Sequence, residues 1–177
     1  MKTLETQRLL LRGWETRDLD DLYAYARDPA VGPNAGWPAH ASKADSATIL
    51  QRFMEDGEVW AIEHKADRLV IGSIGLHRDR LREGVNSKML GYVLAQPYWG
   101  QGLMVEAAQR VIQFAFEEMG LDILAVYHYP HNVRSRRVIE KCGFVHEGTL
   151  RQGSKLFDGT VQDSVCYSIL RGEYFGC

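Results

Sequence analysis

Apolar residues follow two different periods along this chain, and the two periods predict strands in one part and helices in another. Val59 to Glu63, Leu69 to His77 and Lys88 to Ala95 are rich in Val, Ile and Leu and are separated by charged turns, which predicts three strands. Gly102 to Met119 instead repeats its apolar residues with the helical period, and Gly120 stands where a helix commonly ends. The apolar positions of this predicted helix are 104, 108, 111, 112, 115 and 119.

Shorter signals place the other elements. Asp18 to Asp21 predicts the start of a helix with Asp18 as its N-cap, and Asp28-Pro29 predicts its end. Ser42-x-x-Asp45 has the pattern of a capping box and predicts a second helix to about residue 55. Strands followed by helices in this order predict an α/β sheet. The remaining predicted strands are 8–14, 123–129, 144–150 and 161–170, and the remaining helix is 133–142.

The composition indicates an ordinary globular protein. A chain of 177 residues, 45% hydrophobic and 25% charged, predicts one domain over residues 1–177. A net charge of −2 argues against a general binder of nucleic acid or of an anionic membrane surface. No hydrophobic signal region opens the chain, and the apolar stretch from Met89 to Ala95 is too short to span a bilayer. Three cysteines (Cys142, Cys166 and Cys177) without metal-type spacing favour reduced thiols, no metal site and a cytoplasmic location.

The segment Tyr98-Trp99-Gly100-Gln101-Gly102-Leu103-Met104 lies between a predicted strand and a predicted helix. A helix N-terminus offers unpaired N–H groups and about half a positive charge, and the two glycines let a phosphate approach the backbone closely. A turn that needs glycine for its shape alone would explain an isolated Gly-x-Gly equally well. A dinucleotide fingerprint requires a third glycine where Val105 stands, and an NTPase loop requires Gly-Lys-Ser/Thr, which is absent.

A second cluster, Asn132-x-x-Ser135, opens the predicted helix at 133–142, which ends in Glu140-Lys141-Cys142-Gly143-Phe144. Asn132 is a favourable N-cap, and Ser135 lies one turn later on nearly the same side. A purely structural role would explain this cluster by itself. The two clusters, however, both follow predicted strands, and ligands bind at the carboxyl ends of neighbouring strands in α/β sheets.

These motifs resemble those of the GCN5-related N-acetyltransferases. The similarity rests on Pro97 to Gly102, on Glu106-Ala107 and on Asn132 to Phe144, and it extends over essentially the whole chain. Within that family the chain is most similar to the branch that acetylates the N-termini of ribosomal proteins, because of Leu4 to Arg12, Gly91-Tyr92 and Glu147-Gly148-x-x-Arg151. Pro97 replaces the Gln or Arg that many members carry, a change that is common in this branch.

The resemblance implies a mixed sheet of about seven strands, splayed at its middle and flanked by about four helices, with acetyl-CoA as co-substrate. It implies direct attack of a neutral amine on the thioester, with no cysteine intermediate. Asn132 would contact the pantetheine arm, and Ser135 would hydrogen-bond or protonate the departing thiolate. The residues implied in cofactor binding are Tyr92, Val93, Leu94, Gly100, Gln101, Gly102, Leu103, Met104, Asn132 and Ser135.

The general base is open at this stage. An amine must lose a proton before it attacks, so a carboxylate, a histidine or a water chain is expected. Glu147 and His77 are the first candidates, and Glu106 and Asp163 follow. Each could instead have a structural role, as a helix-start acid, a turn residue or an ion-pair partner.

The acceptor and the assembly are also open. A peptide N-terminus or a small monoamine is favoured over a polyamine or aminoglycoside, because the only dense acidic run, Asp18 to Asp21, is better explained as a helix start. A CoA-binding regulatory domain without turnover and a nucleotide-binding α/β protein are the alternative classes. The 30–41 loop, with Trp37, could line a substrate pocket or simply connect two helices, and a homodimer is possible. The basic residues Arg134, Arg136, Arg137 and Lys141 are interpreted mainly as a solvated helix face.

Overall fold

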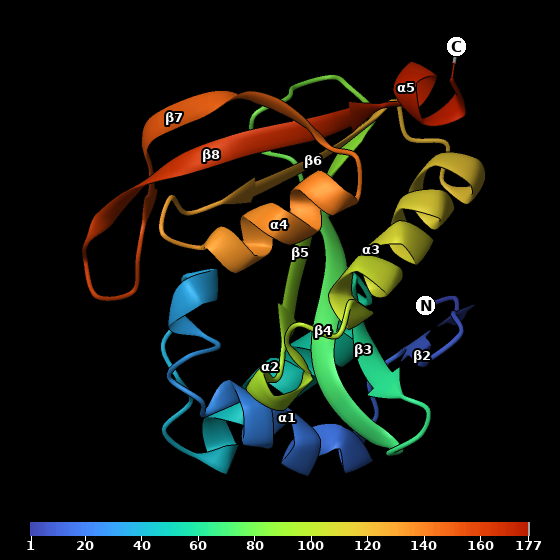
Figure 1. Ribbon diagram of the computed structural model, residues 1–177. Helices are drawn as coiled ribbons and strands as arrows, with labels where there is room; N and C mark the ends of the chain where they lie inside the picture. The colour runs from blue at the N-terminus through green and yellow to red at the C-terminus, as the bar shows by residue number, and fades with distance from the viewer. Residues whose placement is uncertain (177) are drawn as a thin grey trace. The chain divides into compact units, whose positions relative to one another are not determined.

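The computed structural model describes residues 1–176 and contains an eight-stranded mixed sheet with five α-helices (Figure 1). The strand order is β1-β2-β3-β4-β5-β6-β8-β7. The chain forms two compact units, residues 1–75 with 92–107, and residues 76–91 with those from 108 onward. Strands β4 and β5 and helix α3 each run from one unit into the other. The predicted α/β class is confirmed, with eight strands where about seven were expected and five helices where about four were expected.

The first unit is built on strands whose residues are buried on both faces. Ala61 and Ile62 are neighbours that point to opposite faces of one strand, and both are completely buried, so this strand lies inside the unit. Leu9 and Leu11 are completely buried on one face of another strand. β2 pairs antiparallel with β3, and β3 with β4. The bounds are β1 (Leu4–Glu5), β2 (Leu9–Arg12), β3 (Val59–His64), β4 (Leu69–Arg78) and β5 (Ser87–Leu94).

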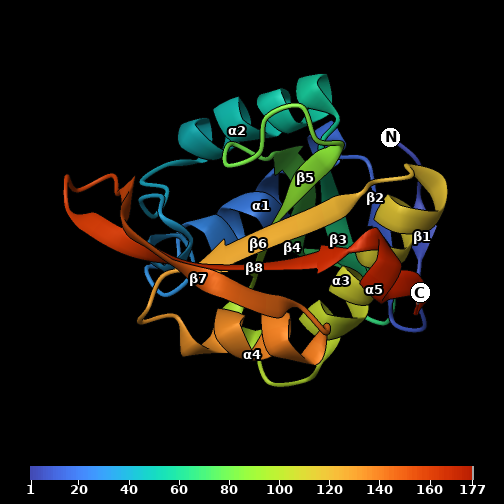
Figure 2. The same cartoon turned by 90° about the horizontal axis from the view of Figure 1, so that it is seen from above.

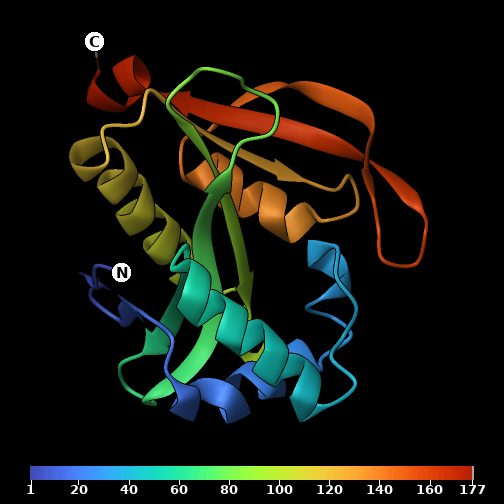
Figure 3. The same cartoon turned by 180° about the vertical axis from the view of Figure 1, so that it is seen from behind.

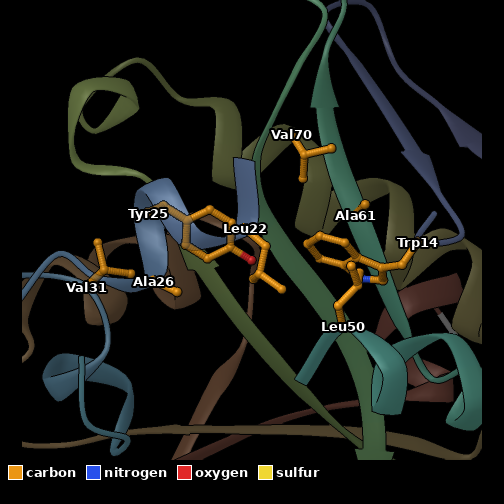
Figure 4. Packing of buried hydrophobic residues seen from close by; sticks show 8 residues of the cluster. All are labelled: Trp14, Leu22, Tyr25, Ala26, Val31, Leu50, Ala61 and Val70. Atoms are coloured by element: carbon orange, nitrogen blue, oxygen red, sulfur yellow. The ribbon is translucent and has the colours of Figure 1, made fainter. Parts of the chain in front are cut away.

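Helices α1 (Leu19–Ala26) and α2 (Lys43–Asp56) pack against each other in this unit, as Figure 3 shows. Their apolar faces close a core cluster that includes Trp14, Leu22 and Leu50 (Figure 4). The rings of Trp14 and Phe53 also pack against each other, with centroids 5.4 Å apart. On α1, Tyr25 is buried in this core, whereas Tyr23 is only partly buried. Short 3-10 helices complete the unit at η1 (Thr16–Asp18), η2 (Pro33–Ala35) and η3 (Gln96–Tyr98).

The second unit contains the antiparallel strands β6, β8 and β7, side by side in Figure 2. Its parallel pairing joins Ser87 of β5 to Ile123 of β6. Helix α4 packs against β6. The bounds are β6 (Ile123–His128), α4 (Val133–Lys141), β7 (Val145–Lys155), β8 (Val161–Leu170) and α5 (Arg171–Phe175).

The long predicted helix is α3 (Leu103–Gln113), and it changes to a π-helix, η4 (Phe114–Glu118), before Gly120 ends it with φ 68°. The π-turn inserts extra backbone per turn, so the buried face passes to Phe116, which is fully buried. Met119 was predicted to lie on the apolar face, and this prediction is wrong because its side chain is 40% exposed. Among residues 1–176, no helix combines the length and the apolar character that crossing a membrane requires.

Candidate functional site

The glycine segment forms the predicted loop between β5 and α3. Gly100 and Gly102 both adopt the left-handed conformation, with φ of 77° and 78°. Residues with a Cβ rarely adopt this conformation, so the two glycines give the loop its path. The loop is fastened to neighbouring segments, since Tyr98 Oη donates to Asp67 Oδ2 at 2.7 Å and Arg8 Nη1 donates to the Gln101 carbonyl at 3.0 Å. The Asp67 carboxylate, with burial, raises the pKa of Tyr98 to about 12, so this phenol remains a donor.

The N–H groups of the loop are left open. Within residues 1–176 no chain atom accepts a hydrogen bond from the backbone amides of Gly100, Gln101, Gly102, Leu103 or Met104. Farther along the helix, Glu106 N donates to the Gly102 carbonyl at 3.1 Å. Successive unpaired amides at a helix N-terminus are the arrangement that binds phosphate oxygens.

The end of β5 approaches its neighbour unusually closely. A Cβ on Gly72 of β4 would lie only 2.3 Å from the Val93 carbonyl oxygen, so only glycine leaves room there. Ala95 N donates to the Ile71 carbonyl at 2.7 Å, and Trp99 Nε1 donates to the Leu94 carbonyl at 2.7 Å. These contacts hold the Tyr92–Leu94 backbone, which was expected to meet the pantetheine arm, directly ahead of the glycine loop.

In the second unit, the pairing of β5 with β6 is short. Its register covers Ser87 with Ile123, Lys88 with Leu124 and Met89 with Ala125. Both strands continue beyond this register, β5 with Leu90 and Gly91 and β6 to His128. A sheet in which two parallel strands pair over so few residues agrees with the expected splay.

Asn132 caps α4 as predicted. Its Oδ1 accepts from Ser135 N at 3.0 Å, and Asn132 and Ser135 are both partly buried. The cap therefore brings the amide and the hydroxyl-bearing residue together at the start of one helix. Their predicted roles toward a pantetheine arm and a thiolate stay predictions.

With this geometry in place, the comparisons with known proteins decide the family. A family model described as the acetyltransferase (GNAT) domain matches residues 8–145. The chain belongs to the GNAT acetyltransferase family. The match confirms the resemblance carried by the two motifs, the fold and the N-acetyltransferase class.

Relatives of this GNAT protein cover most of its length. YoaA of Bacillus subtilis (strain 168), by name an uncharacterized N-acetyltransferase, is 29% identical over 173 residues, which are 95% of this chain and 96% of YoaA. YdaF of the same strain, named as a proposed ribosomal N-acetyltransferase, is 36% identical over 111 residues, 62% of this chain and 58% of YdaF. A crystal structure of a GNAT-family acetyltransferase from Bacillus anthracis matches with a TM-score of 0.88 at 24% identity, covering 97% of this chain and all of that chain, which shows the shared fold.

The first base candidate of this GNAT protein, Glu147 on β7, is held in a polar network. Its Oε1 accepts from Arg82 Nη2 and, at 2.8 Å, from Ser168 Oγ. Arg82 also donates to Asp79 at 2.8 Å, so it joins two carboxylates. The arginine and the hydroxyl both occupy this carboxylate, which favours a structural role for Glu147. Its role as a base stays a prediction.

His77 lies at the end of β4 with its ring against Gly91 of β5. A Cβ on Gly91 would lie 3.0 Å from Cδ2 and Nε2 of the ring, so the glycine makes room for the imidazole. His77 is partly buried, and its catalytic role stays a prediction. Asp163 accepts from Gln152 N at 2.8 Å and thereby supports a left-handed residue with φ 52° in the β7–β8 ribbon.

Glu106 is a structural acceptor. Its carboxylate receives hydrogen bonds from Thr6 Oγ at 2.6 Å, from Arg8 N at 2.8 Å and from Arg8 Nε at 2.7 Å. Burial alone would raise the pKa of Glu106, but these donors together outweigh burial and lower it. A carboxylate saturated in this way is a poor proton acceptor. The contacts of Thr6 and Arg8 were missed in the sequence, because no periodicity links residues nearly a hundred positions apart.

The acidic run at Asp18 to Asp21 is engaged within its own unit. Asp18 stands at the N-cap position but its side chain makes no cap bond, which corrects the prediction that it caps α1. Asp18 instead accepts from Arg12 at 2.7 and 2.8 Å, Asp21 accepts from Val70 N at 2.8 Å, and Asp20 lies 2.7 Å from Lys43.

The described cysteines are unsuited to nucleophilic chemistry. Burial raises the pKa of Cys142 to about 11, and burial is also the largest cause of the raised pKa of Cys166. Both thiols therefore stay protonated at neutral pH. Only the deprotonated thiolate is a good nucleophile, so neither cysteine suits nucleophilic catalysis. Cys177 lies outside the described residues. On α4, Arg136 pairs with Glu140 at 2.7 Å, as expected for a solvated helix face.

Proposed function

We propose that this GNAT protein moves the acetyl group of acetyl-CoA to a primary amine by direct attack on the thioester. The observation that carries the proposal is the open set of amides from Gly100 to Met104 at the start of α3. Their donors and the helix dipole suit the diphosphate of CoA. The loop follows directly on the β5 residues Tyr92 to Leu94, where the resemblance expects the pantetheine arm.

The proposed chemistry needs one proton acceptor and one proton donor. The amine nitrogen attacks the thioester carbon after losing its proton, the oxyanion is stabilised by an N–H group near Val93, and the C–S bond then breaks. Ser135 donates a hydrogen bond or a proton to the departing thiolate. His77 and Glu147 remain the proposed bases, and the contacts of Glu147 with Arg82 and Ser168 make His77 the better candidate.

The proposed acceptor is the N-terminal amine of a peptide or protein. Recognition of a polycation would call for an unengaged acidic surface, and the densest acidic run, Asp18 to Asp21, is already bound to Arg12, Lys43 and a backbone N–H. The name of YdaF, a ribosomal N-acetyltransferase, points in the same direction. A small monoamine is the alternative acceptor. The same hypothesis places the protein in the cytoplasm. It also includes a homodimer, formed by pairing of the edge strand β7.

Release of CoA thiol in the presence of candidate amines tests the proposal. We expect thiol release and a mass gain of one acetyl group with unblocked peptides that copy the N-termini of ribosomal proteins. N-acetylated copies of the same peptides serve as matched controls and should give none. Turnover with spermidine or an aminoglycoside in place of peptides would favour the second acceptor class.

A regulatory domain is distinguished by the same assay. If calorimetry shows acetyl-CoA binding but no amine supports thiol release, the protein is a CoA sensor. A melting shift with ATP or NAD, and none with CoA, would contradict the carrier assignment altogether.

A further inference from the structure

The segment between β1 and β2 is bonded to the start of α3. Thr6 Oγ and Arg8 N both donate to Glu106 Oε1, and Arg8 Nε donates to Oε2 at 2.7 Å. The Glu106 side chain is 19% exposed, so these bonds are largely shielded from water. The charge-assisted bonds fix both the backbone of Arg8 and the near end of its guanidinium fork.

The remaining part of the Arg8 guanidinium faces the glycine loop. Nη1 donates to the carbonyl of Gln101, the residue between the two left-handed glycines. Nη2 is 3.7 Å from the position that a Cβ on Gly102 would occupy, and no atom of residues 1–176 accepts a hydrogen bond from it. With Nε on Glu106 and Nη1 on the loop, Nη2 keeps its N–H groups for a ligand beside the loop. Arginine N–H groups form charge-assisted hydrogen bonds with phosphate oxygens.

The negative charge of Glu106 also favours a cation at the start of α3. Glu106 lies in the first turn of α3, where its negative charge would oppose an anionic ligand at the same helix end. The ion pair with Arg8 compensates that charge, so the donors of the loop keep their attraction for an anion. The side chain of Arg8 is 41% exposed and therefore accessible to a ligand.

We propose that Arg8 is a positioning and phosphate-binding residue, which sets the loop through the Gln101 carbonyl and offers Nη2 to the diphosphate of the carrier. This inference rests on the proposed function, because it takes CoA as the carrier. It adds a residue of the N-terminal segment to a site that so far consists of the backbone amides from Gly100 to Met104.

The test separates phosphate binding from general support of the fold. Arg8→Met is compared with Arg52→Met, which removes an exposed arginine that pairs with Asp56 on α2. We expect Arg8→Met to weaken binding of both CoA and dephospho-CoA by roughly tenfold or more in calorimetry, the scale of a lost charge-assisted bond. The two losses should be equal, since both carriers keep the diphosphate. Arg52→Met should bind both carriers as the wild type does.

A donor without phosphates gives the second readout. With S-acetyl-pantetheine, kcat/KM of Arg8→Met should match the wild type, whereas KM for acetyl-CoA rises and kcat changes by less than about twofold. An equal loss with both donors would mean that Arg8 only supports the fold, and unchanged CoA binding would also overturn the inference.

One further variant and one choice of assay cover the other ways in which the test could fail. Arg8→Lys keeps the charge but cannot serve Glu106 and Gln101 together, so it should fall between the wild type and Arg8→Met; it replaces Arg8→Met if that variant does not fold. Binding is measured without an acceptor, so a protein that binds CoA but never turns over contradicts the proposed function and leaves the Arg8 result readable.

Discussion

Helices α2 and α3 begin in opposite ways within the same unit. At α2, Ser42 Oγ accepts from Asp45 N at 3.3 Å and Asp45 Oδ2 accepts from Ser42 N at 2.9 Å, so the chain closes its own helix end. At α3, two glycines stand where side-chain acceptors would be, and the amides from Gly100 to Met104 stay open within residues 1–176. A protein that can cap one helix with its own residues leaves another open where a ligand supplies the acceptors.

The strongest way to break this contrast is to place an anion at the start of α3. In Gly102→Asp, the new aspartate tolerates the left-handed conformation better than most residues would. Its carboxylate would repel a diphosphate by about 4 kcal/mol per charge pair at 4 Å. We expect CoA affinity to fall by two to three orders of magnitude, roughly the same energy. Calorimetry measures the loss, and Gly102→Asn is the matched neutral variant, which should lose about tenfold or less. Equal losses for Asp and Asn would refute the electrostatic account.

The second change acts on the strand that leads into the loop. Gly72→Ala places a Cβ against the Val93 carbonyl, so β5 must shift at the residues proposed to meet the thioester. We expect a loss of about 2 kcal/mol in the free energy of unfolding, and a lower kcat. Urea denaturation and the thiol-release assay measure the two effects. Gly13→Ala is the control, because nothing lies within 4 Å of its added Cβ, and it should be neutral or slightly stabilising.

Opening the closed helix should affect stability and leave the site unchanged. Ser42→Ala removes the acceptor for Asp45 N and should cost about 1 kcal/mol of unfolding free energy. The KM for acetyl-CoA should stay at the wild-type value. A raised KM in a fully folded Ser42→Ala variant would show that the two helix starts are not independent.

The smallest expected effect is a pH dependence at Glu106. Its folded-state pKa is lowered, so its contribution to stability is complete above the unfolded carboxyl pKa of about 4.3 and is lost as the pH falls through the folded value. Urea midpoints taken from about pH 6 downward should therefore decline less steeply in Glu106→Gln than in the wild type. Glu55→Gln, which changes an exposed glutamate that accepts from Gln51, should decline as the wild type does.

Local signals in the sequence predicted most elements of this fold. The capping box at Ser42 and Asp45 involves neighbours in the chain, and both of its bonds form. Asn132 likewise caps α4. The π-turn at 114–118 was not predictable from periodicity, because an inserted residue changes the phase of the apolar pattern and exposes Met119.

Long-range contacts account for what the sequence did not predict. Asp18 has the residue type and position of an N-cap, yet the nearby Arg12 guanidinium binds its carboxylate. Glu106 was considered as a base or as a helix-start acid, and its three donors come from Thr6 and Arg8 in another segment. Strand pairing brings such groups together, and one sequence by itself contains no record of the pairing. The glycine loop was predictable because its function depends on backbone geometry that Gly-x-Gly requires locally.

The indole of Trp99 has a consequence for the choice of acetyl donor. By binding the Leu94 carbonyl it ties the strand end to the residue just before Gly100, so the separation between the two ends of the proposed carrier site is set by a short, braced piece of chain. The length of the flexible arm between thioester and diphosphate must therefore match this fixed separation. Acetyl phosphate joins its acetyl group directly to phosphorus and has no such arm. If the proposed function is right, acetyl phosphate should therefore not serve as an acetyl donor for this protein, even at high concentration.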